Sequence, residues 1–271
     1  MSVESAVDRD RAAAHRERLA PYVEPHLARR ARGEKHPVHD FMFGYYSQRP
    51  AQLLRWSAGF PESASLDEVR ERRPLIETTR RLLAATASRP AHTGCFGLHE
   101  WAMVYRSAAH GTRHPQRLRL GDTATDEVVE SHRITCSHFD AFRFFTPDAR
   151  PRNTLQPGRD DRPDFEQPGC LHAGMDLYKH AFRLSPLVLS DLVADAFELA
   201  WEIRVLDMRA APYDMSGVML DPTGEEWTPV RIETADGKRE YAAAQAGFAE
   251  RGAPVRAALI AECDRLLAEL G

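Results

Sequence analysis

The clearest helical pattern in the chain spans residues 177–209, LYKHAFRLSPLVLSDLVADAFELAWEIRVLDMR. Ser190 is of a residue type that often caps helix N-termini, and apolar side chains recur after it every three or four positions. They form a wide stripe of Leu192, Val193, Ala196, Phe197, Leu199, Ala200, Ile203 and Leu206. A stripe of this width predicts a helix that packs against the core, and Pro212 predicts its end.

Weaker helical patterns and a few strand signals surround this block. Residues 66–87 predict two helices divided at Pro74, because proline disrupts a helix interior. Residues 239–270 predict one or two amphipathic helices around Gly252 and Pro254. Short strands or a hairpin are expected at residues 117–120, 126–136 (helix or strand), 142–145 and 228–237. The expected fold is therefore mostly α, of the α+β kind, with a single helical domain and a few short strands.

The sequence also predicts how the chain divides into domains. Residues 1–34 predict a solvated N-terminal helical arm interrupted by Pro21 and Pro25, and residues 35–271 a single globular domain. Residues 146–168 contain five prolines and predict a long loop. Loops of this length are usually functional or disordered, and its place between histidine-containing segments indicates a lid or binding loop.

Composition limits the class of protein. The hydrophobic content of 43% and charged content of 28% are typical of a soluble globular chain. No apolar run approaches the roughly 18 residues that span a bilayer, and no signal-peptide pattern opens the chain, so a cytoplasmic protein without membrane partners is expected. The net charge of −4 does not support DNA as a partner, although DNA remains compatible with local clusters of the 36 basic residues. The four cysteines do not form a disulfide framework.

Cysteine, histidine and acidic residues recur together in three segments. These are residues 95–100 (CFGLHE), 136–140 (CSHFD) and 170–180 (CLHAGMDLYKH). In each, a cysteine precedes a histidine by two to four positions and a carboxylate lies nearby. Eight of the twelve histidines fall between His92 and His180, which favours one shared polar site. The recurrence predicts that the three segments meet in the fold.

Imidazole and carboxylate groups bind transition metals, and histidine is also the usual acid–base residue near neutral pH. The expected metal ligands are His99, His138 and His172, with Glu100, Asp140 or Asp176 completing the set. The ion would be iron or zinc, in a non-haem iron oxygenase or a metallohydrolase. The alternative for each histidine is a buried, hydrogen-bonded core residue, and for each cysteine a small core residue.

Five blocks carry a resemblance to a known family. They are residues 36–53, 94–106 (GCFGLHEWAMVYR), 136–145 (CSHFDAFRFF), 167–179 (QPGCLHAGMDLYK) and 206–214 (LDMRAAPYD). On these blocks the chain, from about residue 36 to 270, resembles a bacterial family whose members carry the label 3-methyladenine DNA glycosylase. The resemblance implies an N-glycosylase that acts on a purine base in DNA or in a nucleoside.

Base excision needs a pocket that stacks on the flipped base and a carboxylate that supports departure of the base. The carboxylates that the resemblance suggests for this role are Asp140, Asp176 and Glu100. The suggested substrate-binding residues are Trp101, Tyr105, Phe142 and Tyr178 for stacking and Arg143 for phosphate. The substrate would be a nucleobase or another small molecule.

A third alternative is a non-catalytic protein that binds a ligand or haem. Other classes are disfavoured, because the chain contains neither a glycine-rich phosphate loop nor a dinucleotide-binding fingerprint. It also lacks the G-x-S-x-G motif of α/β-hydrolases.

Overall fold

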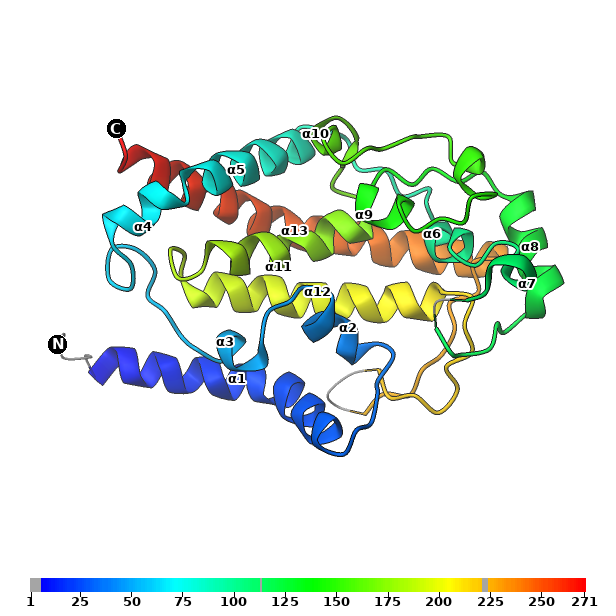
Figure 1. Cartoon of the computed structure of the whole chain (residues 1–271), viewed down its shortest axis with the longest axis horizontal. Coiled ribbons are helices and arrows are strands. Elements are labelled where there is room, and N and C mark those ends of the chain that lie inside the picture. Colours follow the sequence, from blue (N-terminus) through cyan, green and yellow to red (C-terminus); the bar gives the residue numbers. More distant parts are fainter. Residues whose placement is uncertain (1–5, 113, 221–223) are drawn as a thin grey trace.

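The computed structural model describes residues 6–112, 114–220 and 224–271, and Figure 1 shows their arrangement. Helices account for 60% of the chain and strand for 2%, which confirms the prediction of a mostly helical fold. The core is built from four long helices that pack on one another, namely α5 (Arg73–Ala87), α11 (Leu171–Leu184), α12 (Ser190–Ala210) and α13 (Ala235–Ala268). In Figure 1 these helices run along the long axis of the molecule.

Helix α12 occupies the centre of this core. It contacts α11, α13 and α1 (Ala6–Ala31), and most of its residues are buried, while Asp195 and Glu202 are exposed on one face. A helix with so wide an apolar face packs that face into the core. Residues 185–189 join α11 to α12, and so short a connection makes the two helices antiparallel neighbours. The strongest helical pattern of the sequence therefore forms the interior of the bundle.

Helix α1 packs against α12 along its length and is not a solvated extension. Leu19 and Val23 are fully buried, and the ring of Tyr22 lies 4.9 Å from that of Trp201. The predicted interruption at Pro21 and Pro25 is wrong, because the helix continues through both. Both prolines lie on its exposed side, where water can satisfy the carbonyl groups that lose a backbone partner.

The expected strands form at most as isolated bridges, and helix is the outcome as far as Ser131 in residues 126–136, where the sequence left helix or strand open. Residues 121–131 form helix α8 (Gly121–Ser131), with Val128 and Val129 on its buried face. The Asp236-Gly237 pair, expected in a hairpin, lies in the first turn of α13, where Gly237 donates its N–H to the Thr234 hydroxyl. In the described residues, strand pairing is limited to isolated bridges, which are Leu118–Tyr213, Ile134–Asn153 and Met219–Glu226.

Helix α13 runs unbroken past Gly252 and Pro254, where the sequence left open one helix or two. A Cβ on Gly252 would lie 3.5 Å from Leu177 and 3.7 Å from Leu199. The missing side chain therefore lets α13 approach α11 and α12 closely. The free energy gained from this close packing offsets the free energy lost where Pro254 removes a backbone hydrogen bond.

Short helices fill the connections and gather mainly at one end of the bundle (Figure 1). They are α2 (His39–Gly44), α3 (Pro50–Leu53), α4 (Leu66–Glu71), α6 (Leu98–Ala102), α7 (Ser107–His110), α9 (Phe139–Phe142), α10 (Arg162–Phe165) and the 3-10 turn η1 (Arg150–Arg152). The proline-rich segment 146–168 contains η1 and α10. Through α10 it contacts α5 and places Arg162 beside the buried Asp176 of α11.

Candidate functional site: a buried histidine–aspartate cluster beside an aromatic cavity

Three buried side chains from three helices meet in the interior, namely His99 of α6, His172 of α11 and Asp207 of α12. Each offers one possible ligand atom, and these atoms all lie within 4.8 Å of one another. In the described part of the chain this is the one group of histidine, cysteine and acidic residues whose ligand atoms converge so closely. We call these three residues the His/Asp cluster.

The turn that leads into α6 positions His99. Gly97 precedes the helix with φ of +72°, a left-handed conformation that favours glycine. A Cβ at this position would lie 3.2 Å from Ala210 and 3.3 Å from Tyr241. Gly97 thus allows the chain both to turn and to lie against α12 and α13, which brings His99 to Asp207.

Hydrogen bonds and ion pairs fix the cluster. His99 Nε2 lies 2.8 Å from Asp207 Oδ1, and His99 Nδ1 lies 3.4 Å from the Sγ of Cys95. Arg204 donates to Asp207 Oδ2 at 2.7 Å and reaches Glu100 at 3.5 Å. The ring of His172 packs edge-on against His99, with 4.7 Å between the ring centroids.

The charges of the His/Asp cluster follow from burial and from these contacts. Burial alone would lower the pKa of His99, but the Asp207 carboxylate holds that pKa well above its usual value. Burial alone would raise the pKa of Asp207, but His99 and Arg204 lower it, so Asp207 is ionised. Burial and the neighbouring His99 lower the pKa of His172 to about 3. His172 is therefore neutral, and its buried Nδ1 has no hydrogen-bond partner among the described residues.

A cavity of about 140 Å³ adjoins the His/Asp cluster and is open to it through His172. One part of its wall is apolar and mostly aromatic, formed by Phe41, Tyr45, Met103, Phe144 and Tyr213. The other part is polar, formed by Glu100, His114, Asp140, His172 and Arg204. This volume is below the roughly 300–1,000 Å³ of pockets for drug-sized ligands, so the cavity suits a small, flat molecule.

The two carboxylates of this wall have opposite pKa shifts. Burial and the nearby Asp207 raise the pKa of Glu100. Burial alone would raise the pKa of Asp140 as well, but Lys179 at 2.9 Å lowers it. Two carboxyl groups whose surroundings separate their pKa values in this way can act as an acid and as an ionised stabilising group.

A second polar network lies beside the cluster around His138. His138 Nε2 lies 3.2 Å from Glu166 and 3.5 Å from Asp176. Arg162 pairs with both carboxylates, at 2.8 Å in the case of Asp176, and Lys179 contacts Asp176 at 3.0 Å. Burial alone would raise the pKa of Asp176, but these cations and His138 hold it well below its usual range. The network is charge-balanced, which favours a structural role that joins the 146–168 segment to α11.

The structure brings some of the predicted site residues together and separates others. Glu100, Asp140 and His172 line the cavity, and His99 lies behind His172. His138 lies on another side of His172, with 5.4 Å between ring centroids, and Asp176 belongs to the His138 network. The expected meeting of the three Cys–His segments is thus seen in the fold.

The predicted substrate-binding residues Trp101, Tyr105, Phe142, Arg143 and Tyr178 do not line the cavity. Trp101 is fully buried and donates its indole N–H to the carbonyl of Ala210, and Tyr105 donates its hydroxyl to Glu130. Tyr178 packs between Tyr46, which follows α2, and Phe197 of α12. Phe142 packs against Phe145, and Arg143 pairs with Asp140. The aromatic wall is made instead by residues that the sequence did not single out.

The sequence also did not single out Asp207 and Arg204 as site residues. Both interrupt a long apolar helix, and their i, i+3 spacing places them side by side. Charged residues inside an otherwise buried helix need partners, and this was the signal that could have found them.

Cys136 and Cys263 are buried, and Cys95 and Cys170 are partly buried. The described structure contains all four as free cysteines, in agreement with the sequence. Burial raises the pKa of Cys170 to about 12 and raises that of Cys136 well above its usual value, so neither is a reactive thiolate. Cys95 alone among them contacts the cluster, through His99.

No protein-family model, curated protein or solved structure matches this chain. Among the helices of the described residues, none has the length and apolar character needed to cross a membrane.

Proposed function

We propose that the protein is a metal-dependent enzyme that holds one iron(II) or zinc(II) ion between His99, His172 and Asp207. The observation that carries the proposal is the convergence of these three buried ligand atoms within 4.8 Å, beside a cavity. Two histidines and one carboxylate form the ligand set of many non-haem iron enzymes, and zinc also accepts it.

The residues fit such an ion in their chemistry. His172 is neutral, which is the form that binds metals, and its Nδ1 is buried without a partner. Asp207 is ionised and keeps Oδ2 bonded to Arg204, while Cys95 contacts the second nitrogen of His99. Such outer contacts orient metal ligands in known sites. His99 would release its proton on binding.

A metal ion in this position would supply Lewis-acid or redox chemistry at the end of the cavity. The protein's own residues would do the rest. Glu100, with its raised pKa, can give or take a proton at the cavity wall. Arg204 holds both Glu100 and Asp207 in place, and its guanidinium lies 4.1 Å from the ring centroid of Phe41. The aromatic wall favours a small planar ring compound as substrate.

Metal analysis of protein purified without chelators tests the proposal. We expect about one equivalent of iron or zinc by mass spectrometry, and loss of that metal in His172→Asn. The matched control is His180→Asn, since His180 lies on the same helix, is equally buried and has the same unpartnered Nδ1, but is outside the cluster. Absence of metal from the wild type, or equal loss in both variants, would overturn the proposal.

A second candidate function is excision of a purine base, as the family resemblance implies. The specific observation in its favour is that Glu100 and Asp140 line one aromatic cavity with opposite pKa shifts. In this reaction the bond between the sugar and the alkylated, positively charged base would break, and the ionised Asp140 would stabilise the positive charge that passes to the sugar. Water would add to that sugar carbon, and Glu100 would take the proton that the water loses. The ring would lie against the aromatic wall.

The two candidates respond differently to metal removal. Base excision needs no metal, so protein treated with a chelator should still release 3-methyladenine from alkylated DNA, and Glu100→Gln and Asp140→Asn should each slow the release. Release of bases by chelated protein would favour the glycosylase, and failure of both metal-loaded and chelated protein to release bases would exclude it.

A further inference from the structure

A groove of about 450 Å³ lies where the end of α11 meets the region of α3 and the residue that follows α4. Its lining includes Arg55, Arg72 and Arg183 and no acidic residue. In the described part of the chain, none of these three arginines forms an ion pair with a carboxylate. The chain as a whole carries more acidic than basic residues, 40 against 36.

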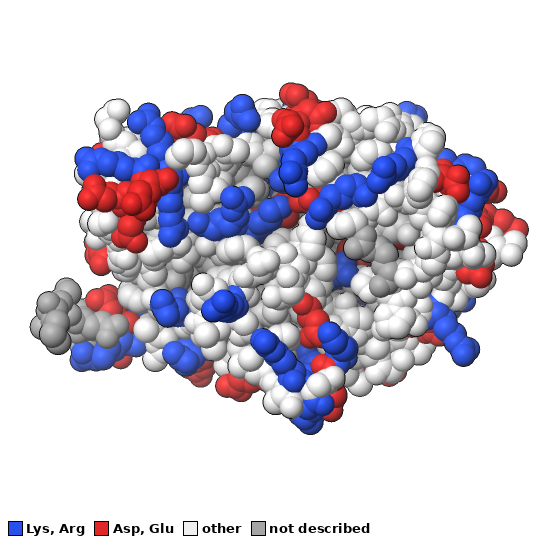
Figure 2. All heavy atoms as spheres, in the orientation of Figure 1, with Lys and Arg blue, Asp and Glu red and all other residues white. Residues whose placement is uncertain are grey.

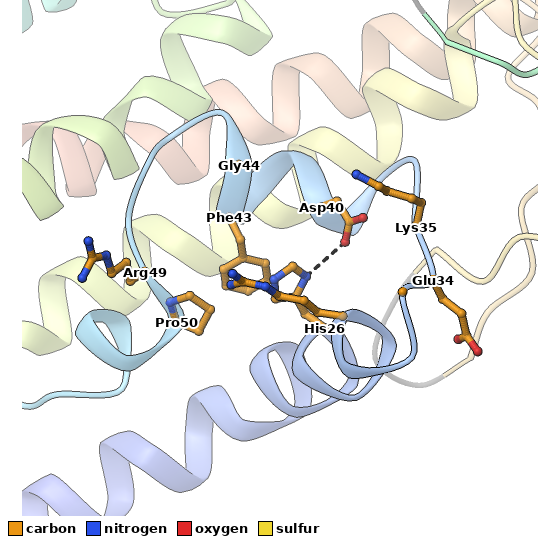
Figure 3. A pocket seen from close by; sticks show the side chains of 10 residues that line it. His26, Glu34, Lys35, Asp40, Phe43, Gly44, Arg49 and Pro50 are labelled. Carbon is orange, nitrogen blue, oxygen red and sulfur yellow. Dashed lines mark hydrogen bonds and ion pairs between the residues drawn. The ribbon is translucent and has the colours of Figure 1, made fainter.

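Another hollow of the surface provides a contrast. The hollow between α1 and α2, drawn in Figure 3, also contains basic residues, but Asp40 and Glu34 lie among them. There His26 pairs with Asp40 at 3.0 Å and stacks on Phe43. Its lining thus carries charges of both signs, whereas the lining of the arginine groove carries only positive ones.

The arginines are held where a ligand can reach them. Arg72 is fixed by hydrogen bonds from Nη1 to the carbonyls of Ser185, at 2.6 Å, and Arg183, at 3.4 Å. Arg55 and Arg183 are exposed. Figure 2 shows that lysine and arginine side chains gather in a row across the middle of the molecule, where α11 runs in Figure 1. Three cations in one groove repel one another, and a bound anion would relieve that repulsion.

Two further groups of the groove define the rest of the ligand. Gln48 is only 6% exposed, lines the groove, and has a side-chain oxygen without a hydrogen-bond partner among the described residues. This oxygen calls for a donor such as a hydroxyl group. Phe182 adds an apolar surface. Ser47, at the edge of the groove, has φ of +59°, a strained conformation of the kind that is often found at ligand sites.

We propose that this arginine groove binds a small phosphorylated metabolite that carries a hydroxyl group, of the sugar-phosphate class. The phosphate would lie between Arg55, Arg72 and Arg183, since guanidinium groups match phosphate oxygens in geometry and charge. The groove has the volume of a small-molecule pocket. It lies about 16 Å from His172 along α11, from the 1.5 Å rise of a helix over eleven residues, so it is distinct from the cavity of the proposed active site.

Titration calorimetry of the full chain with ribose 5-phosphate, ribose and inorganic phosphate tests this site. We expect saturable binding of ribose 5-phosphate, at least about tenfold tighter than that of ribose or of inorganic phosphate, because only the sugar phosphate engages both the arginines and Gln48. Arg183→Gln and Arg55→Gln should each weaken this binding by about tenfold. The matched control Arg73→Gln changes an exposed arginine next to Arg72 that pairs with Glu77 outside the groove, and it should bind like the wild type.

Three results would overturn the proposal. The first is no measurable binding of ribose 5-phosphate, and the second is equal binding by the wild type and the two groove variants. The third is tighter binding of a short single-stranded DNA than of ribose 5-phosphate with the same dependence on Arg55 and Arg183, which would assign the groove to nucleic acid. Because Arg55 and Arg183 are exposed, their replacement should leave the fold intact, which a thermal melt would check.

Discussion

Replacing Asp207 with asparagine removes the carboxylate that His99 and Arg204 share. The side chain is fully buried, and its two contacts measure 2.8 and 2.7 Å. Removal of one partner from a buried group of charges costs about 3–5 kcal/mol, because the remaining charges have no water to solvate them. His99 can release its proton and so reduce this cost. We therefore expect a loss of about 3 kcal/mol in the free energy of unfolding.

The assay is thermal unfolding of metal-free protein in the presence of a chelator, so that loss of a bound ion does not contribute. A loss of this size should lower the Tm by roughly 6–12 °C in a chain of this length. The control is Asp195→Asn, which removes an exposed partner of Arg18 on the same helix and should change the Tm by no more than about 2 °C.

The pH dependence gives the prediction a second test. The pKa of His99 is raised by Asp207 against the effect of burial, so its contribution is complete below about pH 6.5 and is lost as the pH rises through the raised value. The pKa of Asp207 is lowered, so its contribution is present above about pH 3.9 and is lost as the pH falls. The gap in Tm between wild type and variant should be largest between about pH 4 and 6.5. A gap that widens at alkaline pH, or a loss below about 1 kcal/mol at pH 6, would refute the reasoning.

Three other predictions concern Glu100, the pH dependence of metal binding and the packing of α13. Glu100→Gln should raise the Tm at pH 7, because the raised pKa of Glu100 shows that its ionised form is unfavourable in the fold; a lower Tm would contradict this. The affinity for iron(II) or zinc(II) should increase with pH, since His99 must lose its proton, and calorimetry in buffers of different ionisation enthalpy should detect about one proton released per ion. Gly237→Ala should destabilise the protein severely, because the new Cβ would overlap the backbone carbonyl of Arg231, whereas Gly247→Ala in the same helix meets no atom within 4 Å and should stabilise by up to about 1 kcal/mol. Equal melting temperatures for these two variants would contradict the packing at the start of α13.

The sequence predicted the helical interior because a 3.6-residue period is a local property. The stripe from Leu192 to Leu206 needed no knowledge of its partners, and it forms the central helix. It did not predict the burial of α1, because the residues that cover Leu19 and Val23 come from α12, far along the chain. The sequence could not decide between helix and strand at residues 126–136, because β-branched residues such as Val128 pack equally well on the buried face of a helix when tertiary contacts supply the burial.

Part of the site was predictable from the sequence, because it also rests on a local pattern. Cysteine, histidine and acidic residues recur together in short segments, and this recurrence indicated His99 and His172. Asp207 becomes visible as a cluster member only when α6 and α12 are side by side, since 108 residues separate it from His99. The aromatic wall is likewise assembled from distant segments that include Phe41 and Tyr213.

Anomalous diffraction at the iron and zinc absorption edges, from crystals of protein purified without chelators, tests the central claim most directly. The account predicts one strong peak within bonding distance of His99, His172 and Asp207, at roughly 2.0–2.2 Å from the ligand atoms. A peak at another place, or a His99–Asp207 hydrogen bond with no metal peak beside it, would contradict the account. Excision of a purine base in the aromatic cavity would then be the better proposal for the function.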